Sequence, residues 1–293
     1  MAGPLRIGTR GSALARWQAN HVAALLGGEH EIVVITTVGD RGEGIGDKTR
    51  WTSALEQALL DDRIDVAVHS AKDVPGELAE GTVIGAIPAR GSASDVICGA
   101  TTITSLASGA RVGTSSLRRT AQLRAIREDL EIVELRGNVD TRLRKLAEGA
   151  FDAIVLAAAG VERLGRADAI DGSLAELTPA PGQGALLLQA RAGDAHTLAE
   201  VRVLSDGSTE ACVLAERAIA SALGASCNTP LGASAVPDGE HIRLRAWIGL
   251  PDGSHWIADE ITSAASEVGP ALAERMSSVG ARELLVAAEE MAA

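Results

Sequence analysis

The sequence is poor in aromatic residues and in cysteine. Its 293 residues include no tyrosine and one phenylalanine, so few side chains could stack on nucleic-acid bases. Cys98, Cys212 and Cys227 form an odd and sparse set, which fits a reducing compartment better than a disulfide framework. The sequence also lacks an apolar run of about 18 residues and a secretory signal pattern. We therefore expect a soluble, cytoplasmic protein.

Positive charge is also in short supply. The chain has 27 Lys and Arg residues against 39 Asp and Glu residues, a formal net charge of −12. This charge argues against a general affinity for nucleic acid or for anionic membranes. A composition that is 46% hydrophobic and 23% charged is typical of globular proteins, and the length predicts about two or three domains.

One pattern repeats along the first 180 residues: a short apolar run, a loop with Gly, Ser or Arg, and then a segment with helical periodicity. In the first copy, residues 5–8 suit a strand, and Ser12 is in position to cap the following helix. Strands that alternate with helices predict an α/β fold with mixed, largely parallel sheets. After residue 209 the order changes to a helix, a loop with Cys227, and two strands around the turn at 251–253, which predicts a small α+β domain.

The few basic residues are concentrated between Arg111 and Lys145, where nine Lys or Arg residues stand against five Asp or Glu. Three predicted junctions between a strand and a helix carry arginine: Arg10, the pair Arg118 and Arg119, and Arg136. Such junctions line the crevice of open α/β sheets, where helix N-termini already favour anions. The pattern predicts a site for a substrate with several acidic groups, because arginine suits bidentate binding of carboxylates.

A plainer interpretation is that these arginines form a solvated helix face with partners such as Glu128 or Glu131. Against this, adjacent arginines at a helix start oppose the helix dipole, so that some anion should compensate them.

Asp73 is an acidic residue among these basic junctions. It follows a predicted strand in the segment His69, Ser70, Lys72 and Asp73. Its carboxylate could hold a substrate N–H group or transfer a proton, or it could merely cap the turn before Pro75. His69 alone is more typical of a structural histidine.

Cys227 differs from the other two cysteines. Cys98 lies in a β-branched run and Cys212 on an apolar helix face, so both are expected in the core, whereas Cys227 lies in the small and polar segment "LGASCNTPLG". None of the three has neighbours with metal-ligand spacing, so we expect no metal site.

Six motifs occur in one order along nearly the whole chain: "RIGTRGSALARWQA", "DVAVHSAKDVP", "VGTSSLRR", "ELRGNVDTRL", "PGQGA" and "CNTPLG". Together they resemble the porphobilinogen deaminase family, also called hydroxymethylbilane synthase. The resemblance implies two lobes like those of periplasmic binding proteins and a small third domain. It implies the boundaries 1–88 plus 185–203 for domain 1, 92–180 for domain 2 and 207–293 for domain 3.

The resemblance also implies a transferase of heme biosynthesis that condenses four porphobilinogen molecules head to tail and releases hydroxymethylbilane. Its dipyrromethane cofactor would be attached to Cys227 through a thioether. Asp73 would be the catalytic residue, contacting pyrrole nitrogens and assisting proton removal. Further cofactor-binding residues would be Ser70, Lys72, Thr114, Ser115, Ser116, Arg118, Arg119, Gly137 and Asn138. Substrate-binding residues would be Arg10, Ser12, Arg136, Arg142, Arg163 and Gln183. The family suggests a monomer.

The sequence departs from the family in the loop at 39–53, which is shortened, with Lys48 and Trp51 at the family's Lys and Phe positions. Trp51 would then lie near the cleft, unless it packs on the helix with Leu55 and Leu59. The competing hypothesis for the whole chain is a non-catalytic, two-lobed anion receptor, which would have no use for Cys227 or Asp73. A nucleic-acid binder is disfavoured by the net charge.

Overall fold

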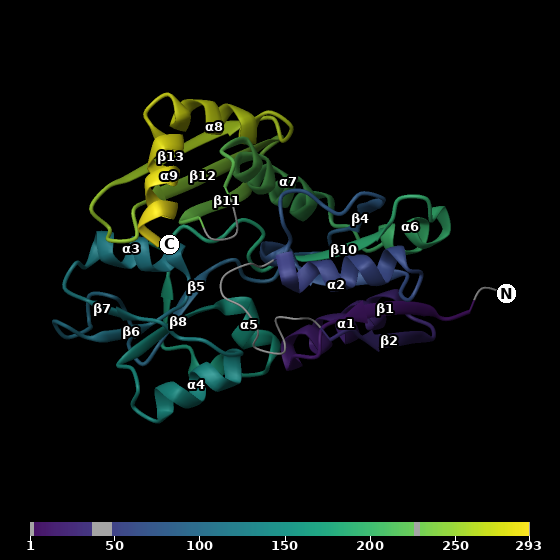
Figure 1. Ribbon diagram of the computed structural model, residues 1–293, viewed down its shortest axis with the longest axis horizontal. Helices are drawn as coiled ribbons and strands as arrows, with labels where there is room; N and C mark the ends of the chain where they lie inside the picture. Colours follow the sequence, from purple (N-terminus) through teal and green to yellow (C-terminus); the bar gives the residue numbers. More distant parts are fainter. Residues whose placement is uncertain (1–2, 37–48, 226–228, 293) are drawn as a thin grey trace. The chain divides into compact units, whose positions relative to one another are not determined.

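The computed structural model describes residues 3–36, 49–225 and 229–292 (Figure 1). The chain divides into two compact units. The first comprises Met1–Gly91 and Ala185–Glu210, and the second comprises Ser92–Gly184 and Ala211–Ala293.

The first unit is built on a five-stranded sheet with the order β2-β1-β3-β10-β4. Its strands are β1 (Leu5–Thr9), β2 (His30–Val34), β3 (Val66–Ser70), β4 (Thr82–Ala86) and β10 (Leu186–Arg191). Four strands run in one direction, and β10 runs antiparallel to its neighbours β3 and β4. Strand β10, which comes last in the sequence among these five, therefore lies inside the sheet, between β3 and β4.

Helices cover both faces of this sheet. Helices α1 (Ala13–Leu26) and α6 (Ala195–Arg202) pack on the face that presents Val66 and Val68. Helix α2 (Thr49–Leu60) packs on the opposite face, where Ala67 lies. Because side chains alternate along a strand, His69 of β3 is on the α2 face.

The second unit contains a five-stranded sheet with the equivalent order, β7-β6-β8-β5-β9. Again one strand, β5, runs antiparallel to the other four. Helix α3 contributes Leu123 to the core on one face, and α4 and α5 contribute Leu143 and Val161 to the core on the other. The elements are β5 (Asp95–Cys98), β6 (Arg111–Gly113), β7 (Glu131–Val133), β8 (Ala153–Ala157), β9 (Gly172–Leu174), α3 (Leu117–Ile126), α4 (Val139–Ala147) and α5 (Ala158–Arg163).

A third, antiparallel sheet with the order β11-β12-β13 follows (Figure 1). One core joins it to three helices through residues such as Ile219, Leu244 and Leu272. The strands are β11 (Leu231–Asp238), β12 (His241–Gly249) and β13 (Trp256–Ser263), and the helices are α7 (Gly207–Ala222), α8 (Val268–Ser277) and α9 (Ala281–Ala292).

The predicted α/β class with mixed, largely parallel sheets and a small C-terminal α+β part is confirmed. Cys98 and Cys212 are buried, as expected. Strand β11 was not predicted, because "LGASAVPD" is rich in small residues and contains proline, both unusual in strands. The division into three domains stays a prediction.

Candidate active site

One group of predicted site residues lies at a single edge of the first sheet. Strands β1 and β3 are parallel neighbours, so their carboxyl ends meet at the same edge. Arg10 and Ser12 follow β1, and Ser12 caps α1, its Oγ accepting a hydrogen bond from the N–H of Ala15 at 3.2 Å. Ser70 ends β3, and its Oγ accepts a hydrogen bond from Nε2 of Gln18 on α1 at 2.8 Å.

Asp73 stands at this edge in the short 3-10 helix η2 (Ala71–Asp73), together with Lys72. Both side chains are half-buried. Next to them His69 is buried, and this burial lowers the pKa of its imidazole to about 4, although the charge of Glu56 opposes the shift. His69 is therefore neutral at pH 7, as the structural interpretation of this residue requires.

The second group lies at the corresponding edge of the second sheet, where the loops after the parallel strands β6 and β7 meet. The β6 loop carries Thr114, Ser115 and Ser116, and Oγ of Ser116 caps α3 by accepting the N–H of Arg119 at 3.4 Å. The β7 loop carries Arg136, Gly137 and Asn138, and Asn138 caps α4, its Oδ1 accepting the N–H of Thr141 at 2.9 Å.

Arg142 joins the two loops of this edge. Its Nε donates to the carbonyl oxygen of Gly137 at 2.7 Å, and its Nη2 donates to Oγ of Ser115 at 3.4 Å. Arg136 is exposed and forms an ion pair with Glu134 at 2.7 Å. Arg136 and Arg142 thus belong to a solvent-accessible loop pair.

Arg118 and Arg119 differ, because both are buried around the carboxylate of Asp95. Nη1 of Arg118 lies 2.8 Å from Oδ2 of Asp95, and Nη2 of Arg119 lies 2.7 Å from Oδ1. Burial alone would raise the pKa of Asp95, but the two guanidinium groups outweigh it and hold this pKa well below its usual range. Asp95 is thus an anion that compensates the arginine pair, and the solvated-face interpretation does not apply to these two residues.

The cluster has unused hydrogen-bonding capacity. Its two guanidinium groups carry two positive charges against one carboxylate. Among the described residues, Nε of Arg118 and Oγ1 of Thr178 are buried and have no hydrogen-bond partner. Because buried polar atoms are nearly always satisfied, these atoms fit an acidic, hydrogen-bonding ligand.

Arg163 and Gln183 both contact the segment around residue 184. Nη2 of Arg163 donates to the carbonyl oxygen of Gly184 at 2.7 Å, and burial lowers the pKa of this half-buried arginine. Gln183 is buried, and its Nε2 donates to Oδ1 of Asp95 at 2.9 Å. Gln183 therefore lies in the same cluster as Arg118 and Arg119.

Cys227 lies outside the described residues, and so does Lys48; the side chain of Trp51 is likewise not described. Two elements flank this cysteine in the sequence. Helix α7 ends at Ala222, and β11 begins at Leu231. Close to the loop, Oγ1 of Thr229 donates to Oε1 of Glu289 on α9 at 2.7 Å.

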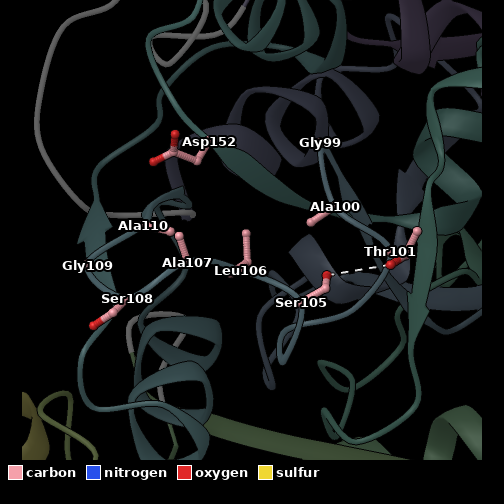
Figure 2. A pocket seen from close by; sticks show the side chains of 10 residues that line it. All are labelled: Gly99, Ala100, Thr101, Ser105, Leu106, Ala107, Ser108, Gly109, Ala110 and Asp152. Carbon is pink, nitrogen blue, oxygen red and sulfur yellow. Dashed lines mark hydrogen bonds between the residues drawn. The ribbon is translucent and has the colours of Figure 1, made fainter.

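The second unit has a hollow of about 600 Å³ at the other edge of its sheet, and Figure 2 shows the residues that line it. Ala110 precedes β6 and Asp152 precedes β8, so both lie at the amino-terminal ends of these strands. The described side chains that line it include no arginine, lysine or histidine. This hollow is therefore separate from the loops that carry the predicted site residues.

Within residues 3–36, 49–225 and 229–292, no group of His, Cys, Asp and Glu side chains could hold a metal ion. No helix in the same part of the chain is long and apolar enough to cross a membrane.

Sequence reasoning missed Asp95, which is separated by more than 20 residues from the arginines it binds. The only local signal was an acidic residue at the start of an apolar strand, "DVIC". A buried charge at such a position requires a partner, but the sequence does not identify which one.

Two family models match the chain. "Porphobilinogen deaminase, dipyromethane cofactor binding domain" matches residues 5–199, and "Porphobilinogen deaminase, C-terminal domain" matches residues 210–278. Among relatives, a porphobilinogen deaminase from Xanthomonas oryzae pv. oryzae is 45% identical over 97% of this chain and 99% of its own length. Those from Campylobacter curvus and Deinococcus deserti are 41% and 44% identical, over 98% and 97% of this chain and 98% of each relative.

Solved structures with some likeness include periplasmic binding proteins. A TRAP periplasmic solute binding protein from Ralstonia eutropha H16 is 12% identical, with a TM-score of 0.41 over 70% of this chain and 78% of its own. A putative periplasmic sulfonate-binding protein from Methylobacillus flagellatus is 12% identical, with a TM-score of 0.39 over 73% of this chain and 67% of its own. Likenesses this weak do not establish a function.

Proposed function

The chain belongs to the porphobilinogen deaminase family, and from that premise we propose that it joins four porphobilinogen molecules head to tail on a dipyrromethane cofactor held by Cys227, and releases hydroxymethylbilane. The reaction makes it a transferase of tetrapyrrole biosynthesis. One observation supports the assignment most: four of the six family motifs include the loops at the carboxyl ends of parallel strands of the five-stranded sheets, β1 and β3 in one and β6 and β7 in the other.

The residues of the second sheet fit a ligand with acetate and propionate groups. Arg118 and Arg119 would bind carboxylates of the cofactor. For Arg118 this is supported by its Nε, which is buried and lacks a hydrogen-bond partner in the described part of the chain. Serine and threonine hydroxyls of the β6 loop and the backbone at Gly137 and Asn138 would assist. When bound, dipyrromethane supplies the pyrrole carbon to which the first porphobilinogen is joined.

Arginines at the solvent-accessible loops would bind each incoming porphobilinogen. Arg136 and Arg142 belong to the β7 loop and to α4, and Arg10 and Ser12 to the corresponding loop of the first sheet. Arg163 and Gln183 would complete the carboxylate contacts of the substrate. Arginine suits this task because its planar fork matches the two oxygens of a carboxylate.

Asp73 would carry the acid–base chemistry. Its carboxylate would stabilise the positive charge that builds up as the carbon–nitrogen bond of porphobilinogen breaks and ammonia leaves. It would then assist removal of the proton that the attacking pyrrole carbon loses after the new carbon–carbon bond has formed. His69, neutral and buried, is not suited to a charge-stabilising role.

We further propose that the protein works as a monomer in the cytoplasm. The sparse cysteines, two of them buried in the described part of the chain, support a reducing compartment.

The assignment is tested by incubating the purified protein with porphobilinogen and measuring its consumption and the release of ammonia. We expect one ammonia per porphobilinogen consumed and four porphobilinogens per hydroxymethylbilane. A folded protein that leaves porphobilinogen unchanged would contradict the assignment.

A further inference from the structure

Residues 178–184, called here the connecting segment, run from the end of the second sheet toward β10. The first residue of the segment is bound tightly to α3. The carbonyl oxygen of Thr178 accepts hydrogen bonds from Nη1 of Arg118 at 2.6 Å and from Nε2 of Gln122 at 3.0 Å. The N–H of Thr178 donates to Oε1 of Gln122 at 2.6 Å. The side-chain amide of Gln122 thus binds both the carbonyl oxygen and the N–H of Thr178.

The other end of the connecting segment is bound to Glu216 of α7. Oε2 of Glu216 accepts the N–H of Gly182 at 2.7 Å, and Oε1 accepts the N–H of Ala235 in β11 at 2.7 Å. Glu216 is completely buried. A buried carboxylate is costly unless hydrogen bonds stabilise its charge, and charge-assisted bonds to two separate segments fix both of them.

The segment also packs directly on β11. The carbonyl oxygen of Pro179 accepts the N–H of Ala233 at 2.8 Å. A Cβ atom at Gly232 would lie 2.6 Å from the carbonyl oxygen of Thr178, so a side chain there would force the two backbones apart. The oxygen that binds Arg118 is therefore in close contact with the strand that follows the cysteine loop.

These contacts form a continuous path from the arginine helix to both elements that flank Cys227. Helix α7 precedes Cys227 in the sequence, and β11 follows it. Glu216 lies on α7 and accepts hydrogen bonds from both the connecting segment and β11. At its other end, the connecting segment is held by the same helix that carries Arg118 and Arg119.

We propose that Glu216 and Gln122 are positioning residues that act through the connecting segment to hold α7 and β11, the described elements on either side of Cys227 in the sequence, in register with Arg118. The inference rests on the proposed function, because it takes Cys227 as the attachment point of the growing chain and Arg118 as a carboxylate binder. A loss of register misplaces the tethered chain relative to its arginines, which slows chain growth without preventing attachment of the cofactor.

The test uses two near-isosteric variants of the full chain, Glu216→Gln and Gln122→Met. The amide of Glu216→Gln accepts one of the two backbone N–H groups but presents its own N–H₂ to the other. Gln122→Met loses all side-chain hydrogen bonds to Thr178. Glu274→Gln, exposed on α8 of the same C-terminal part, is the matched control.

Cofactor loading is measured by intact-protein mass, and chain growth by native mass spectrometry of enzyme–intermediate complexes. We expect each single variant to carry dipyrromethane and to elongate on the order of 10- to 100-fold more slowly, while Glu274→Gln matches wild type. Because both residues act through one segment, the double variant should elongate no more slowly than the slower single variant.

Wild-type elongation rates in the folded single variants would overturn the proposal. So would a double variant whose loss equals the product of the two single losses, since that result means independent structural effects. Should Glu216→Gln not fold, Gln122→Met decides alone: slow elongation with the cofactor loaded supports the proposal, and a wild-type rate refutes it. Failure of the proposed function itself is recognised separately, because wild type would then lack the dipyrromethane mass.

Discussion

The two five-stranded sheets have equivalent strand orders but differ in the charged residues at equivalent edges. In each, the first parallel strand runs into a Gly-Thr pair and then a serine that caps the next helix, Ser12 in the first sheet and Ser116 in the second. The loop after β3 presents the carboxylate of Asp73, whereas the end of β8 continues into the mostly apolar start of α5. The basic residues concentrate instead around α3 and α4.

Strand order thus fixes where a site can form, and a few loop residues determine its chemistry. In the proposed function, the first sheet would supply the acid, and the second would supply most of the carboxylate-binding arginines. The second sheet has two kinds of arginine, since Arg118 and Arg119 are buried around Asp95 while Arg136 is exposed.

The largest effect is expected from Asp73→Asn, which keeps the shape of the side chain but removes its charge and basicity. Turnover should fall by about 10² to 10⁴ or more, because proton transfer and charge stabilisation are lost together. Folding and cofactor loading should be nearly unchanged. The rate of porphobilinogen consumption measures the effect, and Asp61→Asn, exposed in the same unit, is the control. Near-normal turnover by Asp73→Asn would remove this residue from the chemistry.

Replacing a buried arginine should come next. Arg118→Leu leaves a ligand carboxylate unpaired and should reduce binding by about 2 to 5 kcal/mol, so cofactor assembly or early elongation should fail. Asp95→Asn is the informative comparison, since it removes the counter-charge but leaves the guanidinium in place.

Asp95→Asn should lower the free energy of unfolding by about 3 to 5 kcal/mol, measured by urea denaturation, because it leaves two buried positive charges uncompensated. At a temperature where both variants are folded, Arg118→Leu should lose more activity. Equal loss in the two variants would mean that Arg118 serves only the ion pair.

More of the fold than of the candidate site could be predicted from the sequence. Alternating strand and helix patterns and the serine caps are local signals, and they gave the α/β class and helix starts such as that of α1. Asp95 and Glu216 could not be assigned roles, because their partners at Arg118 and Gly182 are distant in the sequence and chosen by tertiary packing. Strand β11 was missed because its neighbours in the sheet, not its own residues, favour it.

Because His69 is buried in the first sheet, we expect the free energy of unfolding to depend on pH. Its pKa is about 4 in the folded state and about 6.5 when unfolded, so the unfolded state binds the proton first. The contribution of the neutral His69 imidazole to the free energy of unfolding is fully present above about pH 6.5. It is lost as the pH falls toward 4, by an amount on the order of 3 kcal/mol. The charges of Glu56 and Asp73 oppose this shift, and Arg10 adds to it.

Urea unfolding between pH 4 and 7 checks this prediction. His69→Gln should flatten the curve in that range, and His241→Gln, exposed in the C-terminal sheet, should not. A curve for His69→Gln parallel to that of wild type would show that His69 titrates normally in the folded protein.

The smallest effect is expected at the exposed loops. Arg136 already forms an ion pair with Glu134 in solvent, and exposed pairs contribute roughly 0.2 to 1 kcal/mol. Arg136→Leu should therefore slow elongation by at most about fivefold. Arg144 of α4 forms a comparable exposed ion pair with Glu148, and Arg144→Leu should have no effect. A complete block in Arg136→Leu would show that solvent exposure does not separate the two kinds of arginine.

Attachment of the growing chain to Cys227 is the step on which the proposed function depends, and intact-protein mass spectrometry measures it. A thiolate is a strong nucleophile, and thiol reductants do not cleave the thioether it forms as they would a disulfide. Wild type, Cys98→Ala and Cys212→Ala should each be heavier than their sequences by one dipyrromethane unit and should react with Ehrlich's reagent, while Cys227→Ala should have its bare sequence mass. An active wild type with the bare mass, or a modified Cys98 or Cys212 peptide beside an unmodified Cys227 peptide, would contradict the account.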